Sequence, residues 1–215
     1  MKAIIIGATG LIGQNFLSLL EIDEYFTEIE IWLRKPIKID SSKVKIKHVD
    51  FERITENEFI HADVVFCCVG TTIKKAKTRE AFRKVDFDIP VNLAKLCANS
   101  NIQKLIIISS LGADRESKNN YLKTKGEMEY AVSQYNIPSI VFLRPSILLG
   151  NRNEFRLGEI IGKIIIQLLG FLLLGKNRKY RGIRAMKVAK AMLNIAKNNT
   201  KGIRILESNE IEKLN

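Results

Sequence analysis

The sequence AIIIGATGLIG at Ala3–Gly13 carries the strongest indication of the fold of this chain. Four apolar residues, Ala3–Ile6, predict a short buried strand, and the apolar residues of Leu11–Leu20 recur at helical spacing. Between them, glycines follow the pattern GxxGxxG. A strand that passes through such a turn directly into a helix is typical of dinucleotide-binding domains. The alternative is a tight strand–helix turn without a ligand.

Each glycine of this turn has a physical role. Gly7 permits the tight turn, Gly10 lets the backbone approach a pyrophosphate, and Gly13 allows the helix to pack closely on the strand. The pyrophosphate then lies against the free N–H groups and the positive dipole end of the helix. The residues predicted to bind the cofactor here are Gly7, Ala8, Thr9, Gly10, Leu11 and Ile12.

Apolar runs and helical stretches alternate along the rest of the chain, which is typical of βαβ units and a parallel sheet. Strands are predicted at Ala3–Ile6, Ile29–Leu33, Val44–Val49, Val64–Val69, Leu105–Ile108, Ile140–Leu143 and Ile203–Leu206. Helices are predicted at Leu11–Leu20, Phe87–Ala98, Tyr121–Tyr135, 157–173 and Arg184–Ala196. With right-handed crossovers and no dividing linker, this order predicts one α/β domain over residues 1–215, a Rossmann-like doubly wound parallel sheet.

The second predicted strand ends at Leu33-Arg34-Lys35, where an NAD-specific domain usually carries an acidic residue, about 20 residues beyond the glycine turn. A guanidinium pairs with a 2′-phosphate, whereas a carboxylate would repel it. Arg34 and Lys35 therefore predict NADP(H) in preference to NAD(H). The alternative is that both are simply exposed charges at a strand end.

Two later loops are also expected to contact the cofactor. Asp50 follows the third strand and is placed to meet the adenine side, and a glycine after the fourth strand lets the backbone pass close to the cofactor. The residues predicted at that second loop are Cys68, Val69, Gly70 and Thr71. Ordinary loop polarity is the alternative at both places.

Tyr121 and Lys125 lie four residues apart on a predicted helix, so their side chains share one face. The strand before this helix ends at Ser109 and Ser110. A phenol ordinarily has a pKa of about 10, and a nearby ammonium favours the phenolate. A serine hydroxyl can hold a carbonyl or alcohol oxygen while a nicotinamide moves a hydride. Because Tyr-x-x-x-Lys is frequent in lysine-rich chains, a core-facing tyrosine with a surface lysine is the alternative.

Together these segments resemble the short-chain dehydrogenase/reductase superfamily, in its atypical extended branch. The matching segments are Gly7–Gly13, Val85–Phe87, Ser109–Ala113, Tyr121–Glu127 and Leu143–Ser146. Within that branch the chain is similar to the small oxidoreductase-like proteins related to the human Tat-interacting protein. The resemblance extends over nearly the whole chain.

The resemblance implies an NADP(H)-dependent oxidoreductase with Ser110, Tyr121 and Lys125 as its catalytic set, Ser109 being the less favoured serine. The further cofactor contacts that it implies are made by Ser109, Tyr121, Lys125, Arg144, Pro145 and Ile147. The chain is shorter than the sugar-nucleotide epimerases of the extended branch. Residues 145–182 are therefore expected to form a small C-terminal substrate-side lobe, and a small carbonyl or alcohol is the expected substrate.

Charge and composition limit the classes of partner that the sequence predicts. The net charge is +12, from 35 Lys and Arg against 23 Asp and Glu, and the basic residues are spread along the chain, so nucleic acid is not an expected partner. Cys67, Cys68 and Cys97 lack CxxC spacing, and His48 and His61 stand alone, so no metal site is expected. No signal peptide or spanning helix is evident, and a cytoplasmic location is expected.

The helix predicted over 157–173 has one narrow polar stripe, and Ile160–Leu174 is otherwise apolar. A surface helix would show a wider polar face. Packing in the core or in a homodimer is favoured, and a hydrophobic substrate pocket is another use. The basic stretch Lys176–Arg184 follows directly, an order that also fits weak peripheral membrane contact through residues 157–184.

Two other functions fit the sequence less fully. A cofactor-binding regulator would use NADPH occupancy to tune protein contacts with little turnover, which a reduced lobe and an apolar helix would suit. A basic nucleic-acid or membrane-surface binder is supported by the net charge alone. The sequence therefore predicts first an oxidoreductase that uses NADP(H).

Overall fold

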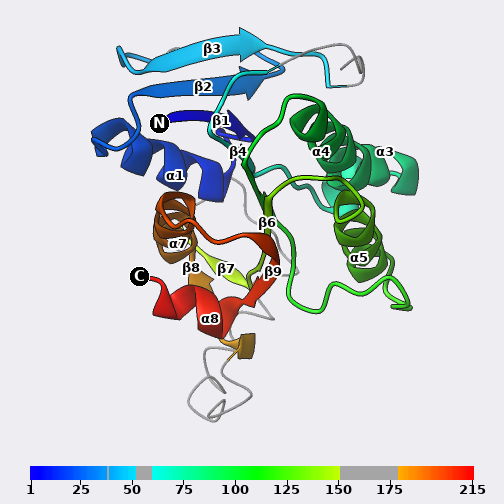
Figure 1. Cartoon of the computed structure of the whole chain (residues 1–215). Coiled ribbons are helices and arrows are strands. Elements are labelled where there is room, and N and C mark those ends of the chain that lie inside the picture. Colours follow the sequence, from blue (N-terminus) through cyan, green and yellow to red (C-terminus); the bar gives the residue numbers. More distant parts are fainter. Residues whose placement is uncertain (38, 52–59, 151–178) are drawn as a thin grey trace.

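Seven parallel strands form the central sheet of the computed structural model, which describes residues 1–37, 39–51, 60–150 and 179–215 (Figure 1). In chain order the strands are β1 (Lys2–Ile6), β2 (Glu28–Leu33), β3 (Val44–His48), β4 (Val64–Cys67), β5 (Lys104–Ile108), β6 (Ser139–Arg144) and β9 (Gly202–Glu207). Their order across the sheet is β3-β2-β1-β4-β5-β6-β9. The predicted Rossmann-like, doubly wound α/β fold is confirmed.

The strand order reverses direction at β1, which lies between β2 and β4. Ile4 pairs with Glu30 on one side and with Val65 on the other. In open α/β sheets, ligands bind beyond the carboxyl ends of the strands at such a switch point. The glycine turn follows β1 directly, so it lies at this point.

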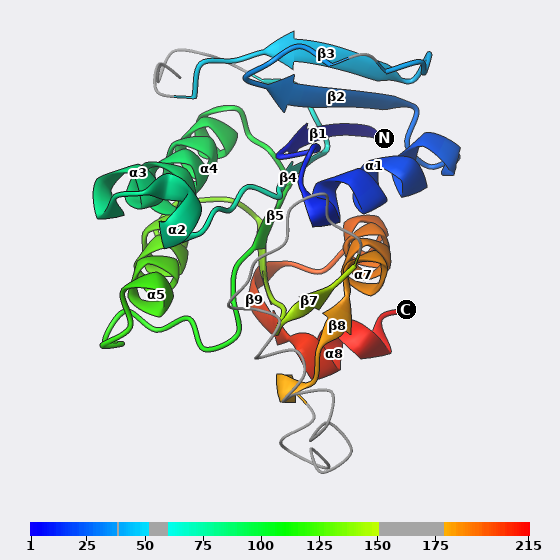
Figure 2. The ribbon, with the colours of Figure 1, turned by 180° about the vertical axis from the view of Figure 1, so that it is seen from behind.

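Helices cover both faces of the sheet (Figure 1 and Figure 2). The pair on one face is α1 (Leu11–Ile22) and α7 (Ala185–Lys197), and the pair on the other face is α4 (Ile89–Asn99) and α5 (Asn120–Val132). Strand β4 is buried on both faces: Val64 and Phe66 pack against the first helix layer, and Val65 and Cys67 pack against the second. Burial on two faces explains why the central strands are nearly continuous apolar runs.

The helical segment before β5 begins earlier than the sequence predicts. The predicted start is Phe87, near Pro90, whereas α3 (Arg79–Arg83) and a π-helical turn, η1 (Lys84–Asp88), precede α4 without a break. A proline lacks an N–H, and its ring crowds the carbonyl four residues before it. A π turn widens the helix at this place, so the helix continues through the proline instead of starting there. The turn carries the buried Asp86.

Other boundaries differ only slightly from the prediction. Strand β4 ends at Cys67, so Cys68 and Val69 belong to the loop, and α5 ends at Val132 rather than Tyr135. The short elements that the sequence does not predict are α2 (Ile73–Ala76), α8 (Ser208–Lys213), β7 (Leu148–Leu149) and β8 (Ile183–Arg184).

The apolar helix expected over 157–173, and most of the lobe expected at 145–182, lie outside the described residues. Strands β7 and β8, on either side of that gap, pair in parallel as a small sheet of their own. Among the helices that the structure describes, none has the length and hydropathy needed to cross a bilayer.

Candidate active site

The glycine turn after β1 lies closer to its neighbours than a side chain would allow. Gly7 has a φ of 84°, and a Cβ on it would lie 2.6 Å from the carbonyl carbon of Cys68. A Cβ on Gly13 would lie 2.1 Å from the carbonyl oxygen of Gly7. Both distances are far inside van der Waals contact, so only glycine fits at these two positions. The turn therefore packs α1 tightly against the ends of β1 and β4.

The first turn of α1 presents backbone N–H groups without a capping side chain. The N-cap is Gly10, whose N–H donates to the Gly7 carbonyl at 3.0 Å, and the N–H of Gln14 donates to the Gly10 carbonyl at 2.8 Å. Between them, Leu11 and Ile12 line a cavity. Unpaired N–H groups and the helix dipole favour an anion at this end of a helix. The turn thus fits the pyrophosphate of a dinucleotide.

That cavity, of about 570 Å³, lies at the carboxyl ends of β1, β4, β5 and β6. It brings together residues from segments that are distant in the sequence. The predicted site residues that line it are Gly10, Leu11, Ile12, Cys68, Val69, Gly70, Thr71, Ser109, Ser110, Tyr121, Lys125, Pro145 and Ile147. Residues predicted for cofactor binding and residues predicted for proton transfer therefore face one cavity.

The predicted residues that do not line the cavity are Gly7, Ala8, Thr9, Arg34, Lys35, Asp50 and Arg144. The first three form the glycine turn itself. Arg34 and Lys35 are exposed just beyond the end of β2, the strand beside β1. Asp50 is exposed after β3. The guanidinium of Arg144, at the end of β6, pairs with Glu129 instead of facing the cavity.

Tyr121 and Lys125 lie one turn apart near the start of α5. The phenol ring of Tyr121 is partly exposed, with its centroid 5.6 Å from that of Phe82. The side chain of Lys125 is 3% exposed, and its Nζ lies 2.8 Å from Oδ1 of Asp86. The same Nζ donates to the carbonyl oxygen of Ile108 at 3.4 Å. Lys125 is therefore a buried residue of the cavity and not a surface lysine.

The surroundings of Lys125 keep it charged. Burial lowers the pKa of Lys125, but the charges of Asp86 and Tyr121 raise it by more, so the pKa lies above its usual value. Asp86 is itself 1% exposed, and its Oδ2 accepts a hydrogen bond of 2.8 Å from the N–H of Thr71. One carboxylate thus contacts both α5 and the loop after β4.

The two serines at the end of β5 differ in their surroundings. Ser109 is buried, and its hydroxyl donates to Oε1 of Glu129 at 2.5 Å. Arg144 donates to both oxygens of the same carboxylate, at 3.0 and 2.6 Å. Ser110 is partly exposed, and its hydroxyl makes one long contact of 3.4 Å to the carbonyl oxygen of Leu111. Of the pair, Ser110 has the hydroxyl that a ligand in the cavity can engage.

The sequence does not predict roles for Asp86, Glu129 or several cavity residues. The others that line the cavity are Thr72, Ile108, Leu111, Ser146, Leu148 and Tyr180. Glu129 follows Lys125 by one helical turn, so the even spacing of Tyr121, Lys125 and Glu129 is a signal that they share one stripe of the helix. Asp86 lies in the matching segment Val85–Phe87, but its contact with Lys125 cannot be read from spacing, because it depends on the π turn and on the packing of η1 against α5.

Cys67 and Cys97 are buried packing groups, whereas Cys68 is partly buried and lines the cavity. Burial raises the pKa of the Cys67 thiol to about 12, and it also raises the pKa values of Cys68 and Cys97. Thiols of this kind are unreactive at neutral pH. Within residues 1–37, 39–51, 60–150 and 179–215, no cluster of three or more His, Cys, Asp or Glu side chains could hold a metal ion.

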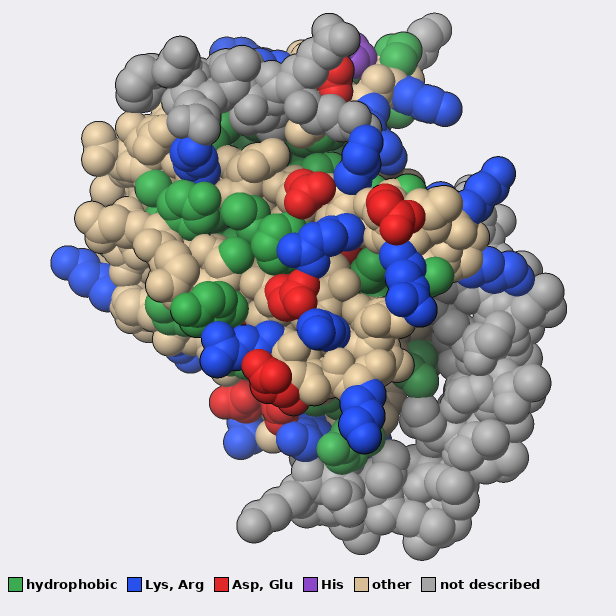
Figure 3. Space-filling model, turned by 90° about the vertical axis from the view of Figure 1, so that its right-hand side faces the viewer, with side chains coloured by type: hydrophobic (Ala, Val, Ile, Leu, Met, Phe, Trp, Pro, Cys, Tyr) green, Lys and Arg blue, Asp and Glu red, His purple; other side chains and the backbone are tan. Residues whose placement is uncertain are grey.

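Basic side chains are dispersed on the side of the molecule where α3, α4 and α5 lie. Figure 3 shows Lys and Arg separated there by acidic, hydrophobic and other side chains. The net charge of +12 is thus not gathered into one basic patch on that side. A dispersed charge of this kind suits a solvated surface.

The family model of HIM1 matches residues 28–168, which is more than half of the chain. The chain belongs to the HIM1 family. The match extends from β2 past the end of β6, so it includes Asp86, Ser110, Tyr121 and Lys125.

Relatives of this HIM1-family chain include a fungal and a mammalian protein. "Protein FMP52, mitochondrial" of Candida albicans is 31% identical over 176 residues, which cover 79% of this chain and 76% of that protein. "Protein HTATIP2" of Rattus norvegicus is 33% identical over 160 residues, which cover 72% of this chain and 66% of that protein. The predicted similarity to proteins related to the Tat-interacting protein is confirmed.

Solved structures share the fold at low identity. MoeE5 in complex with UDP-glucuronic acid and NAD has a TM-score of 0.69 at 15% identity, with 98% of this chain and 80% of that chain covered. WbmG of Bordetella bronchiseptica in complex with NAD has a TM-score of 0.70 at 12% identity, with 99% and 75% covered. The HIM1-family chain therefore has a fold that is also found in NAD-binding proteins.

The expectation of a cytoplasmic protein is wrong, because relatives in Candida albicans, Debaryomyces hansenii and Saccharomyces cerevisiae are named as mitochondrial proteins. That expectation depended on the lack of a secretory signal and of a spanning helix. Those two features separate secreted and membrane proteins from the rest. They do not distinguish the cytoplasm from the inside of an organelle.

Proposed function

We propose that this chain is an NADP(H)-dependent oxidoreductase that transfers a hydride to or from a small carbonyl or alcohol. The observation that carries the proposal is that Ser110, Tyr121 and Lys125 line one cavity with the N-terminus of α1. The fold shared with MoeE5 and WbmG, whose structures contain NAD, supports the cofactor class.

The nicotinamide of the bound cofactor would supply or accept the hydride. The N–H groups of Leu11 and Ile12, in the first turn of α1, would hold its pyrophosphate. The hydroxyl of Ser110 would donate to the substrate oxygen, and the phenol of Tyr121 would give a proton during reduction or take one during oxidation. The fixed ammonium of Lys125 would favour the phenolate when the proton is away.

The cavity lining favours a small, uncharged and hydrophobic substrate. Among the described residues that line it, the charged side chains are Asp86 and Lys125, and they are paired with each other. Leu111, Ile147 and Leu148 supply apolar surface beside the hydroxyls. A charged substrate would have no free partner among these side chains, and burying an unpaired charge is costly.

A panel of small aldehydes and ketones, followed by NADPH absorbance, tests the reaction. We expect Tyr121→Phe to lose about 100-fold or more in turnover, because removing a general acid typically costs that much. Tyr130→Phe is the matched control, since Tyr130 lies on the same helix and is 54% exposed. Equal rates for the wild type and Tyr121→Phe would refute the mechanism.

Cofactor choice is tested by dissociation constants for NADPH and NADH. Arg34 and Lys35 are exposed beyond β2, where a 2′-phosphate would be met by cations. We expect Arg34→Ala to weaken NADPH binding by about 10-fold, equivalent to 1.4 kcal/mol, and to leave NADH binding nearly unchanged. Arg79→Ala, at an exposed arginine on α3, is the control. Tighter binding of NADH than of NADPH by the wild type would contradict the proposal.

A second candidate function is an NADPH-binding regulator with little turnover. One observation favours it: the ammonium of Lys125 is already paired with Asp86, which offsets the charge that reaches Tyr121. A captured protein partner should then bind the apo and NADPH-bound forms with different affinities. Equal affinities would count against this function.

A further inference from the structure

The carboxylate of Asp86 connects two parts of the cavity that are separate in the sequence. Its Oδ2 accepts from the N–H of Thr71, in the loop after β4, and its Oδ1 lies 2.8 Å from Nζ of Lys125 on α5. Both charged side chains are at least 97% buried. Oδ1 has no well-aligned hydrogen-bond donor among the described residues, so the contact with Lys125 is mainly an ion pair.

A π-helical turn places this carboxylate. Asp86 lies in the middle of η1, four residues before Pro90. In a regular helix the carbonyl of Asp86 would accept a hydrogen bond from the N–H of residue 90, which a proline lacks. π turns are rare and are found frequently at functional sites. A buried ion pair is also a poor source of stability, because desolvation offsets much of the attraction. Function is therefore the better explanation for a carboxylate at this position.

We propose that Asp86 is a positioning residue that holds Lys125 as a fixed ammonium between the loop after β4 and the phenol of Tyr121. The role of Asp86 in proton transfer rests on the proposed function, whereas its effect on the protonation of Lys125 does not. Asp86 acts through Lys125, so it needs no contact with the reacting atoms.

Among the residues that the structure describes, Asp86 is the acidic partner of Lys125. From η1 it faces Asp86, from its own helix Tyr121, and from β4 the thiol of Cys67. The next acidic residue along α5, Glu129, is engaged by Arg144 and Ser109. Burial favours the neutral amine, so without Asp86 the lysine would release its proton more readily.

The first experiment measures the lysine directly, without cofactor or substrate. Protein labelled with ¹³C-lysine is titrated by NMR, and the Lys125 resonance is identified by its absence from Lys125→Met. We expect Lys125 to titrate at a lower pH in Asp86→Asn than in the wild type. Asp88→Asn, in the same π turn, should leave it unchanged. Identical titrations of the wild type and Asp86→Asn would overturn the proposal.

The second experiment measures alcohol oxidation against pH with NADP⁺ and the alcohol of the best carbonyl from the panel. In Asp86→Asn we expect the acidic limb of the profile to move to higher pH and the rate at pH 8 to fall about 10-fold or more, since the phenolate loses its ammonium. Asp86→Glu restores the charge and should recover part of the rate. An unmoved limb in Asp86→Asn would show that Asp86 is only structural.

Failure of the two proposals can be told apart. If the wild type oxidises no alcohol and reduces no carbonyl, the proposed function fails while the NMR titration still tests Asp86. If the wild type turns over but Lys125 titrates alike with and without the carboxylate, the inference fails alone. A third variant, Asp86→Ala, also removes the acceptor of the Thr71 N–H, and it should weaken NADPH binding more than Asp86→Asn does.

Discussion

The guanidinium of Arg144, at the end of β6, clamps the carboxylate of Glu129 on α5 through two hydrogen bonds, of 3.0 and 2.6 Å. This pair lies one helical turn beyond Lys125 and fixes the helix that carries Tyr121 to the central sheet. The Glu129 side chain is 6% exposed, so these partners supply the hydrogen bonds that water would otherwise make.

We expect Glu129→Gln to lower the free energy of unfolding by about 2–3 kcal/mol, because Arg144 then loses its counter-charge in a mostly buried place. Glu127→Gln is the matched control, since Glu127 on the same helix pairs with the more exposed Arg83. That change should cost less than about 1 kcal/mol. Urea unfolding of both variants measures the difference, and equal losses would contradict the expected contrast.

Gly13→Ala should disrupt the glycine turn, because its Cβ would lie 2.1 Å from the Gly7 carbonyl oxygen. We expect a loss of about 3 kcal/mol in the free energy of unfolding and weaker NADPH binding. Gly70→Ala is the control, because its Cβ would meet Asp86 Oδ1 at an ordinary 3.6 Å, and it should change stability by about 0.5 kcal/mol at most. Denaturation and fluorescence titration check the pair, and a stable Gly13→Ala would show that α1 can move off the turn.

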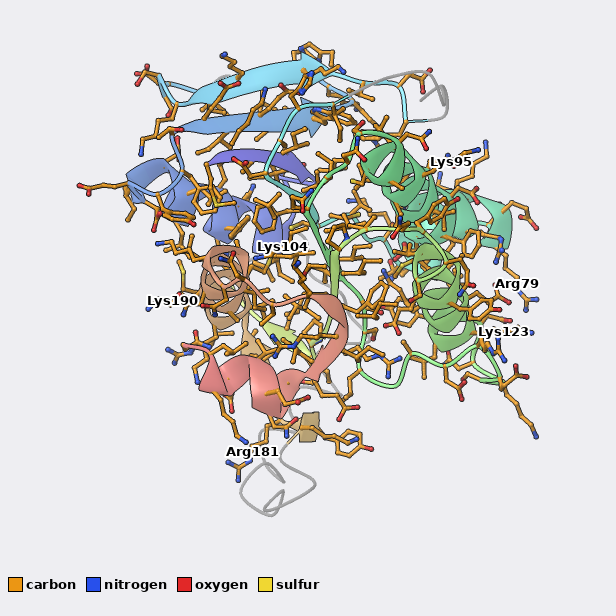
Figure 4. All side chains as sticks on the ribbon, viewed as in Figure 1. Arg79, Lys95, Lys104, Lys123, Arg181 and Lys190 are labelled. Atoms are coloured by element: carbon orange, nitrogen blue, oxygen red, sulfur yellow. The ribbon has the colours of Figure 1, made fainter. Side chains whose placement is uncertain are left out.

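Lys104 caps the carboxyl end of α7 from the neighbouring strand. Its Nζ donates to the carbonyls of Ile195 and Ala196, at 3.0 and 2.8 Å, and to that of Asn198. Figure 4 shows Lys104 between β5 and α7, and Lys190 on the outer side of α7. We expect Lys104→Met to cost about 2 kcal/mol and Lys190→Met almost nothing, as measured by urea unfolding. A harmless Lys104→Met would mean that water satisfies these carbonyls equally well.

The buried thiols should make the fold less stable in alkali. The pKa of Cys67 is raised from 9.0 to about 12 in the folded state, so its stabilising contribution is complete below pH 9 and is lost as the pH rises towards 12. The expected loss is about 1.4 kcal/mol per pH unit for one such group. Between pH 9 and 10.5, the free energy of unfolding should therefore fall less steeply with pH in Cys67→Ala than in the wild type. Parallel slopes for the wild type and the variant would rule this out.

Local sequence patterns predict the strand–turn–helix at Ala3–Gly13, the alternation of strands and helices, and the placing of Tyr121 and Lys125 on one helix face. Each depends on local rules, namely glycine spacing, the burial of apolar runs and the period of a helix. These rules operate within a few residues, so they can be recognised in one sequence.

The side chains that face one another across different helices and strands follow from the packing of the folded chain. Asp86 lies beside Lys125 because of a π turn next to Pro90, and the hydroxyl of Ser109 and the guanidinium of Arg144 both engage Glu129. Such choices depend on where distant segments pack and on which buried charges find a partner. The spacing of residues along the chain does not predict these pairs of side chains, because they come together only once the sheet has formed.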